Sequence, residues 1–333
     1  MNDQDPDRAQ DRDDIGTLIR LAEQDSKIPT ARAARVREAA HEQWAQEIER
    51  RRRRRRVGSV LAAAAMIAGV AFLIRAIPGS GSNGATTITA HIEQLEGRVE
   101  TAALGGDAWS VVAAGDTINA AATVRTMTGR LSLRLDSGHC VRLDRDSELR
   151  FLDEGGLELV AGTIYIDSGP QGRIAGIDLH TPYGIVQEIG TQYEARMSDG
   201  VLRLRLREGS VILRRPDGDH TVDAGNELRV SSTRNPEIVP IEAFGPHWDW
   251  VSEIASIPDF QGRTADEFLR WLAREKGWTL AFADNDVANA ARQTVLEGDL
   301  RRFSPDEALQ IVTTTSRLRY TTEAGVLRVT AER

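Results

Sequence analysis

The chain has 333 residues, a formal net charge of −8 and one cysteine. This length allows more than one domain with its own core. The acidic balance argues against direct binding to nucleic acid or to an anionic membrane surface. The single Cys140 excludes an internal disulfide. Because it lies in an alternating apolar run, we interpret Cys140 as a core residue, with a reactive thiol as the alternative.

Residues 1–56 are predicted to form a short helical segment that begins with a disordered stretch over residues 1–14. Apolar side chains recur at every fourth position of the second predicted helix and give it one narrow stripe. The stripe consists of Val36, Ala40, Trp44 and Ile48. It either packs the short helices against one another or docks on a cytoplasmic partner with Trp44 as the anchor, and the pattern supports both interpretations.

Seven consecutive arginines directly precede an apolar run. The block comprises Arg50, Arg51, Arg52, Arg53, Arg54, Arg55 and Arg56. The following residues, 57–77, are long enough and apolar enough for one helix across a membrane. Basic residues beside a span resist translocation, so the block predicts a cytoplasmic amino end and an external remainder. A cleavable signal peptide and a nucleic-acid-binding patch are the alternatives, but more than fifty residues precede the apolar run.

Residues 78–85 are rich in glycine and serine and are predicted to be a flexible linker. From 86 to 235, apolar and polar residues alternate in short runs, which predicts a β-rich domain. The clearest predicted strands cover 131–135, 140–143, 157–160, 163–166 and 201–206. Turns are expected at 136–138, 161–162 and 208–209. This pattern favours a β-solenoid-like or sandwich-like stack of strands within a mostly β chain.

The order of glycines and small motifs along this segment resembles the FecR domain. The matching landmarks are Gly97, Val99, Trp109, Gly115, Asp116, Gly129, Gly138, Gly162, Tyr165, Thr181, Pro182, Gly184, Gly190, Thr191, Gly209 and Gly225. The resemblance implies a single-pass inner-membrane regulator, or anti-sigma factor, of an extracytoplasmic-function sigma factor. It also implies a β-solenoid-like fold and a link to iron-siderophore or other TonB-dependent uptake.

Residues 236–255 are predicted to be a linker, in which Trp248 and Trp250 pack between the two external domains. Residues 256–333 form an α+β part with a repeat, because two capping boxes begin at Thr264 and Ser304. They predict helices over 265–276 and 305–316. Strands expected before and after each helix, at 257–261, 278–282, 294–300 and 318–321, give a β-α-β unit twice. This part resembles the short amino-terminal domain of secretins and TonB-dependent transducers, which implies docking to the signalling domain of such a transducer.

Catalysis is not expected. The six histidines are scattered without metal-ligand spacing, and no nucleophile elbow or phosphate-binding loop occurs, so neither an enzyme, a metal site nor a cofactor is predicted. The resulting hypothesis is a transmembrane signal relay. The alternative is an envelope-anchored module that binds a periplasmic ligand or protein without controlling a sigma factor.

The topology can be tested with alkaline phosphatase fusions. Because the arginine block holds the amino end inside, we expect a fusion after Ser232 to be active and a fusion after Glu49 to be inactive. Activity is measured in whole cells against equal expression on immunoblots. The reverse pattern would contradict the predicted orientation.

Overall fold

A computed structural model describes residues 88–153, 155–169, 176–232 and 235–332. The predicted amino-terminal segment, the arginine block, the predicted span at 57–77 and the linker at 78–85 lie outside these residues. In the part of the chain that is described, no helix is both long and apolar enough to cross a membrane.

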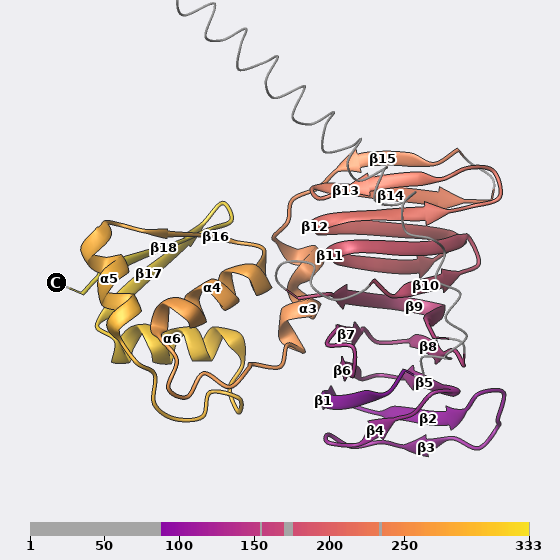
Figure 1. The fold of residues 1–333 in the computed structure, drawn as a ribbon, viewed down its shortest axis with the longest axis horizontal. Helices are drawn as coiled ribbons and strands as arrows, with labels where there is room; N and C mark the ends of the chain where they lie inside the picture. The colour runs from indigo at the N-terminus through magenta and orange to yellow at the C-terminus, as the bar shows by residue number, and fades with distance from the viewer. Residues whose placement is uncertain (1–87, 154, 170–175, 233–234, 333) are drawn as a thin grey trace, which may run out of the picture. The chain divides into compact units, whose positions relative to one another are not determined.

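The β-rich part is one hydrogen-bonded sheet of strands β1 to β15, stacked broadly in chain order (Figure 1). The strands are β1 (Ala90–Glu96), β2 (Val99–Ala103), β3 (Ser110–Val111), β4 (Thr117–Ile118), β5 (Ala122–Thr126), β6 (Arg130–Leu135), β7 (Cys140–Leu143), β8 (Ser147–Phe151), β9 (Leu157–Asp167), β10 (Asp178–Thr181), β11 (Gly184–Ser198), β12 (Val201–Arg214), β13 (His220–Asp223), β14 (Asn226–Ser231) and β15 (Glu237–Pro240). The prediction of a mostly β fold is confirmed.

Strand pairing divides this sheet into two layers. The first layer follows the order β4-β1-β6-β7-β9-β11-β12-β14-β15, and the second follows β3-β2-β5-β8-β9-β10-β11-β12-β13. Strands β9, β11 and β12 take part in both layers. Alternation explains the core: Leu202, Leu204 and Leu206 of β12 are buried between the layers, while the intervening arginines lie on the outer face.

The turns predicted at residues 161–162 and 208–209 are wrong. Both places lie inside continuous strands, where the pairing register slips. Gly162 has φ +84° and Gly209 has φ +74°. These glycines therefore accommodate bulges at which β9 and β12 pass from one layer to the other, instead of reversing the chain. The turn predicted at 136–138 is confirmed.

Residues 236–255 are not simply a linker. Glu237–Pro240 forms β15 and pairs with β14 at the end of the first layer. A short 3-10 helix, η1 (Pro246–Trp248), and helix α3 (Asp249–Glu253) follow. The sheet therefore continues beyond the predicted boundary at residue 235.

The carboxyl-terminal part contains α4 (Ala265–Lys276), β16 (Thr279–Phe282), α5 (Asn285–Gln293), α6 (Pro305–Thr315), β17 (Leu318–Glu323) and β18 (Val326–Ala331). Both predicted capping boxes form, at Thr264 with Glu267 and at Ser304 with Glu307. The three strands pair in the order β16-β18-β17.

The predicted repeated β-α-β unit is wrong in two respects. Residues 257–261 and 294–300 form no strand beyond an isolated bridge between Thr264 and Val295, and residues 285–293 form the unpredicted helix α5. Ile257, Phe260, Leu296 and Leu300 are nevertheless buried in the helical core. Their apolar character reflects burial of irregular segments and does not indicate β structure.

The bulge at Gly162 can be tested by substitution. In Gly162→Ala a Cβ atom would contact the Ser147 Oγ atom and lie 2.5 Å from the Ser147 Cα atom, at φ +84°. We expect the free energy of unfolding to fall by about 3 kcal/mol or more, because backbone strain and a steric clash add.

Gly115→Ala is the control, since φ is +90° there and no atom lies within 4 Å of the added Cβ. It should cost only about 1–2 kcal/mol, the price of the left-handed backbone. Urea unfolding of both variants measures the difference. Equal losses would show that the close packing at the bulge is unimportant.

Candidate functional site

The outer face of the first sheet layer carries polar and charged side chains that contact η1, α3 and α4. We call this surface the docking face, and it comprises Arg130, Arg142, Tyr165, Asp167, Glu194 and Arg207. These residues occupy alternate positions on β6, β7, β9, β11 and β12, so their apolar neighbours point into the core. Arg130, at one end, pairs with Asp144 at 2.8 Å and with Glu253 of α3.

Arg142 of β7 and Glu275 of α4 form a buried ion pair. Their side chains are 3% and 5% exposed, and the second guanidinium contact, Nη2 to Oε2, is 3.1 Å. Arg142 also donates from Nη1 to the Val251 carbonyl oxygen at 2.9 Å. Burial alone lowers the pKa of Arg142, but the Glu275 carboxylate outweighs it and raises the pKa well above its usual value. The arginine therefore stays charged, and loss of Glu275 would leave that charge buried without its partner.

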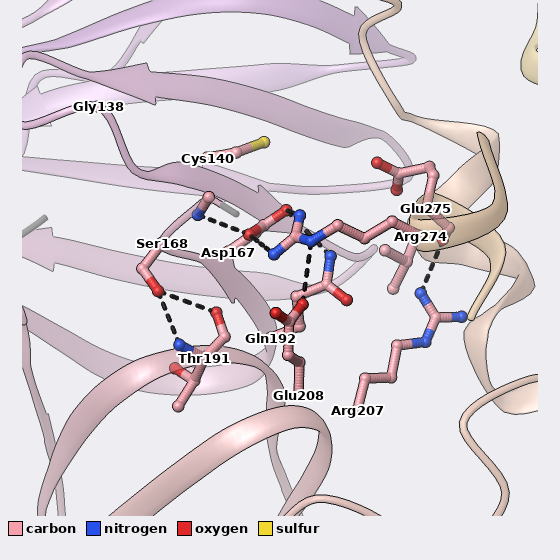
Figure 2. A network of polar contacts seen from close by, with 12 residues as sticks. Gly138, Cys140, Asp167, Ser168, Thr191, Gln192, Arg207, Glu208, Arg274 and Glu275 are labelled. Atoms are coloured by element: carbon pink, nitrogen blue, oxygen red, sulfur yellow. Dashed lines mark hydrogen bonds and ion pairs between the residues drawn. The ribbon is translucent and has the colours of Figure 1, made fainter. Parts of the chain in front are cut away.

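Asp167 of β9 receives a two-pronged contact from Arg274 of α4 (Figure 2). Arg274 Nη1 and Nη2 lie 2.7 and 2.8 Å from the two carboxylate oxygens, and Arg274 Nε lies 2.9 Å from Glu208 Oε2. Gln192 donates to Asp167 Oδ2 at 3.1 Å. Burial raises the pKa of Asp167, but the hydrogen bonds and charge of Arg274 dominate together with the other donors, so the pKa lies below its usual value.

Arg207 holds the chain between the sheet and α4. Its Nε donates to the Ala243 carbonyl oxygen at 2.7 Å, and its Nη1 donates to the Glu275 carbonyl oxygen at 2.8 Å. The guanidinium carbon lies 4.3 Å from the ring centre of Trp248. The two hydrogen bonds to backbone carbonyl oxygens and the cation–π contact thus hold the end of α4 against the sheet.

Trp248 and Trp250 pack on this face with Tyr165 and Val251. They lie in η1 and α3, not in a loop as expected. Trp250 Nε1 donates to Glu194 Oε2 at 2.8 Å. Burial raises the pKa of the fully buried Glu194. The indole N–H thus satisfies an oxygen that water cannot reach.

Gly277 ends α4 in a left-handed conformation, φ +67°, directly beside this contact. A Cβ atom there would collide with the Ala243 carbonyl group. Glycine is therefore needed at this position both for the helix cap and for the close approach of α4 to residues 242–244.

The sequence-predicted site residues, from Val36 to Arg56, lie outside the described residues. The docking face was not predicted. Its only signal in the sequence is the alternation of charged with apolar residues in strands, as in Arg142 between Val141 and Leu143. Cys140 was correctly interpreted as a core residue: it is buried, and burial raises the pKa of its thiol.

The Arg274 contact can be tested by Arg274→Met in the full chain. Removing one partner leaves Asp167 buried and unpaired, which should cost about 2–4 kcal/mol of unfolding free energy at neutral pH. Arg319→Met is the control, because Arg319 pairs with Glu332 at the surface and their side chains are 69% and 44% exposed. It should change stability by less than about 1 kcal/mol.

The same pair predicts a pH dependence. Because the folded pKa of Asp167 lies below its unfolded value near 3.8, its stabilisation is present above about pH 4 and disappears as the pH falls through the folded value. In Arg274→Met only the hydrogen bonds from Gln192 and the Gly169 N–H still oppose burial, so the pKa of Asp167 rises relative to the unmodified chain and its stabilising contribution falls. The deficit of the variant should therefore shrink on acidification. A deficit independent of pH from 7 to about 3 would contradict this role.

Comparisons with known proteins gave one family match and similar solved structures. A search of the curated proteins found no match. Two crystal structures of a candidate anti-sigma factor from Parabacteroides distasonis ATCC 8503 are 13% and 14% identical to this chain, with a TM-score of 0.34 in both cases. They cover 62% of this chain, which in turn covers 97% and 96% of theirs. Residues 122–212 match the family model described as FecR protein.

Proposed function

We propose that this chain is a single-pass inner-membrane regulator of an extracytoplasmic-function sigma factor, with its amino end in the cytoplasm and its described part in the periplasm. The observation that carries the proposal is the match of residues 122–212 to the family model described as FecR protein. The arginine block and the apolar run before the described residues support the orientation.

The docking face supports a relay in which the sheet and the carboxyl-terminal part respond together. Two ion pairs across it, Arg142 with Glu275 and Arg274 with Asp167, are largely removed from water. Displacing the carboxyl-terminal part would expose or strand these charges. A partner that binds the carboxyl-terminal part therefore either breaks these ion pairs or, where they stay intact, transmits its effect to the sheet through them.

The proposed outer partner is the signalling domain of a TonB-dependent outer-membrane transducer, linked to iron-siderophore or similar uptake. Within the described residues, β17 pairs with β18 and leaves its second edge unpaired. Arg319, Thr321 and Glu323 of this strand are exposed. A strand of a partner can add to such an edge through backbone hydrogen bonds, and the resemblance of this part to small docking domains favours that mode.

The proposed inner partner is the sigma factor, bound through the stripe Val36, Ala40, Trp44 and Ile48. We expect a bait of residues 1–56 to recover a sigma factor from cytoplasmic extract, as identified by mass spectrometry. Trp44→Ala should reduce recovery about tenfold or more, since a buried tryptophan anchor contributes about 2 kcal/mol or more to an interface.

Gln43→Ala is the matched control, because it changes the neighbouring residue outside the stripe. Its recovery should equal that of the unmodified bait. Recovery that does not depend on Trp44 would contradict the role of the stripe. Absence of any sigma factor would instead favour an envelope-anchored binding module.

A further inference from the structure

We propose that the first sheet layer contains a binding site for a compact oxyanion, a phosphate or dicarboxylate group, at Arg196, Arg203 and Arg229. These residues, here called the arginine row, lie outside the docking face. The proposal rests on cross-strand register, on an arginine without a counter-ion and on an adjacent cavity. It does not depend on the proposed regulatory function.

Strand register places the three side chains in one row. Arg196 of β11 pairs directly with Arg203 of β12, and Arg203 pairs directly with Arg229 of β14. Neighbouring strands are about 4.8 Å apart, so the row brings three permanent positive charges within about 10 Å. All three point to the outer face, because their neighbours Ala195, Leu204 and Leu228 are buried in the core.

The charges in this row are incompletely compensated. Arg229 Nε contacts Glu227 Oε1 at 2.5 Å, and Glu237 of β15 lies opposite Arg229 across the strands. Arg196 lies 3.6 Å from Asp144 and 3.7 Å from Glu194, both longer than a hydrogen bond. Arg203 forms neither a hydrogen bond nor an ion pair with any residue that the structure describes, and its Nε atom is shielded from solvent without an acceptor. Directly opposed like charges destabilise a sheet, so this arrangement is unfavourable without a bound anion.

In the next row toward the docking face, the arginine is paired with carboxylates on both sides. There, Arg205 is flanked across the strands by Glu194 and Glu227. Arg205 Nη1 lies 3.2 Å from Glu194 Oε1, and its Nε also contacts Glu227. The carboxylates that neutralise Arg205 have no counterpart beside Arg203. A bound oxyanion would supply the missing negative charge beside Arg203.

A cavity of about 320 Å³ opens beside the row. Its lining includes Arg203 and Arg229, the polar side chains of Ser231 and Asn235, and the carboxylate of Glu237. The volume exceeds that of one phosphate or short dicarboxylate. Planar guanidinium groups bind such anions through paired hydrogen bonds, and Glu237 opposes a bound anion.

The test is calorimetric titration of the full-length chain, in a non-ionic detergent, with inorganic phosphate or succinate at constant ionic strength set by chloride. We expect saturable binding of at least one anion, and the comparison of the two identifies its geometry. Arg203→Gln should weaken binding about tenfold or more, because a charge-assisted contact is lost. Glu237→Gln should strengthen it.

Arg214→Gln is the matched control, since it removes the same charge from β12 at an exposed ion pair with Asp219. It should change affinity less than about twofold. A melting curve separates binding from misfolding: without the anion, Arg203→Gln should melt no lower than the unmodified chain, because it relieves like-charge repulsion. Absence of saturable binding by both anions, or equal loss in Arg203→Gln and Arg214→Gln, would overturn the proposal.

Discussion

Buried charge on the outer face of the first sheet layer is the constraint on which this structure depends. Arg142, Asp167 and Glu194 lie on strands whose alternate residues build the apolar core, so they cannot turn away from the face they occupy. Burying them without partners would cost several kcal/mol each. Glu275, Arg274 and Trp250 supply those partners from the carboxyl-terminal side. The two parts of the described chain therefore complete one another.

A contact made of buried ion pairs contributes little net free energy, but it strongly favours one relative position of its two surfaces. The apolar cluster on the docking face is small, consisting of the buried residues Tyr165, Trp248, Trp250 and Val251. Desolvation offsets much of the attraction in the ion pairs, whereas a misplaced guanidinium loses its partner altogether. The position of α4 is thus set by the bidentate contact of Arg274 with Asp167 and by the hydrogen bond from Arg207 to the Glu275 carbonyl oxygen. The contact therefore stabilises the structure only when the ion pairs are aligned, and a shift of α4 would remove that stabilisation.

Local patterns in the sequence predict local structure here, but not the contacts between distant segments. The strand at 140–143 and the helix at 265–276 follow from alternation and a capping box, and both are found with those bounds. The glycines at 162 and 209 correctly indicate a positive φ, yet only the pairing register distinguishes a bulge from a turn. Arg274 and Asp167 are 107 positions apart, so no periodicity reveals their meeting. The docking face therefore required the three-dimensional structure.

The docking face and the arginine row lie on the same outer face of β11 and β12, and their difference follows from the order of charges in the sequence. Alternate residues Arg203, Arg205 and Arg207 of β12 face outward together. Arg207 binds backbone oxygens beside α4, Arg205 lies between two glutamates, and Arg203 lies between two arginines. Along β12 the outward arginines thus change from one that contacts α4, through one that pairs with two glutamates, to one without a counter-ion among the described residues. An anion at Arg203 would act on the same rigid strand that holds α4, about 14 Å away along the strand.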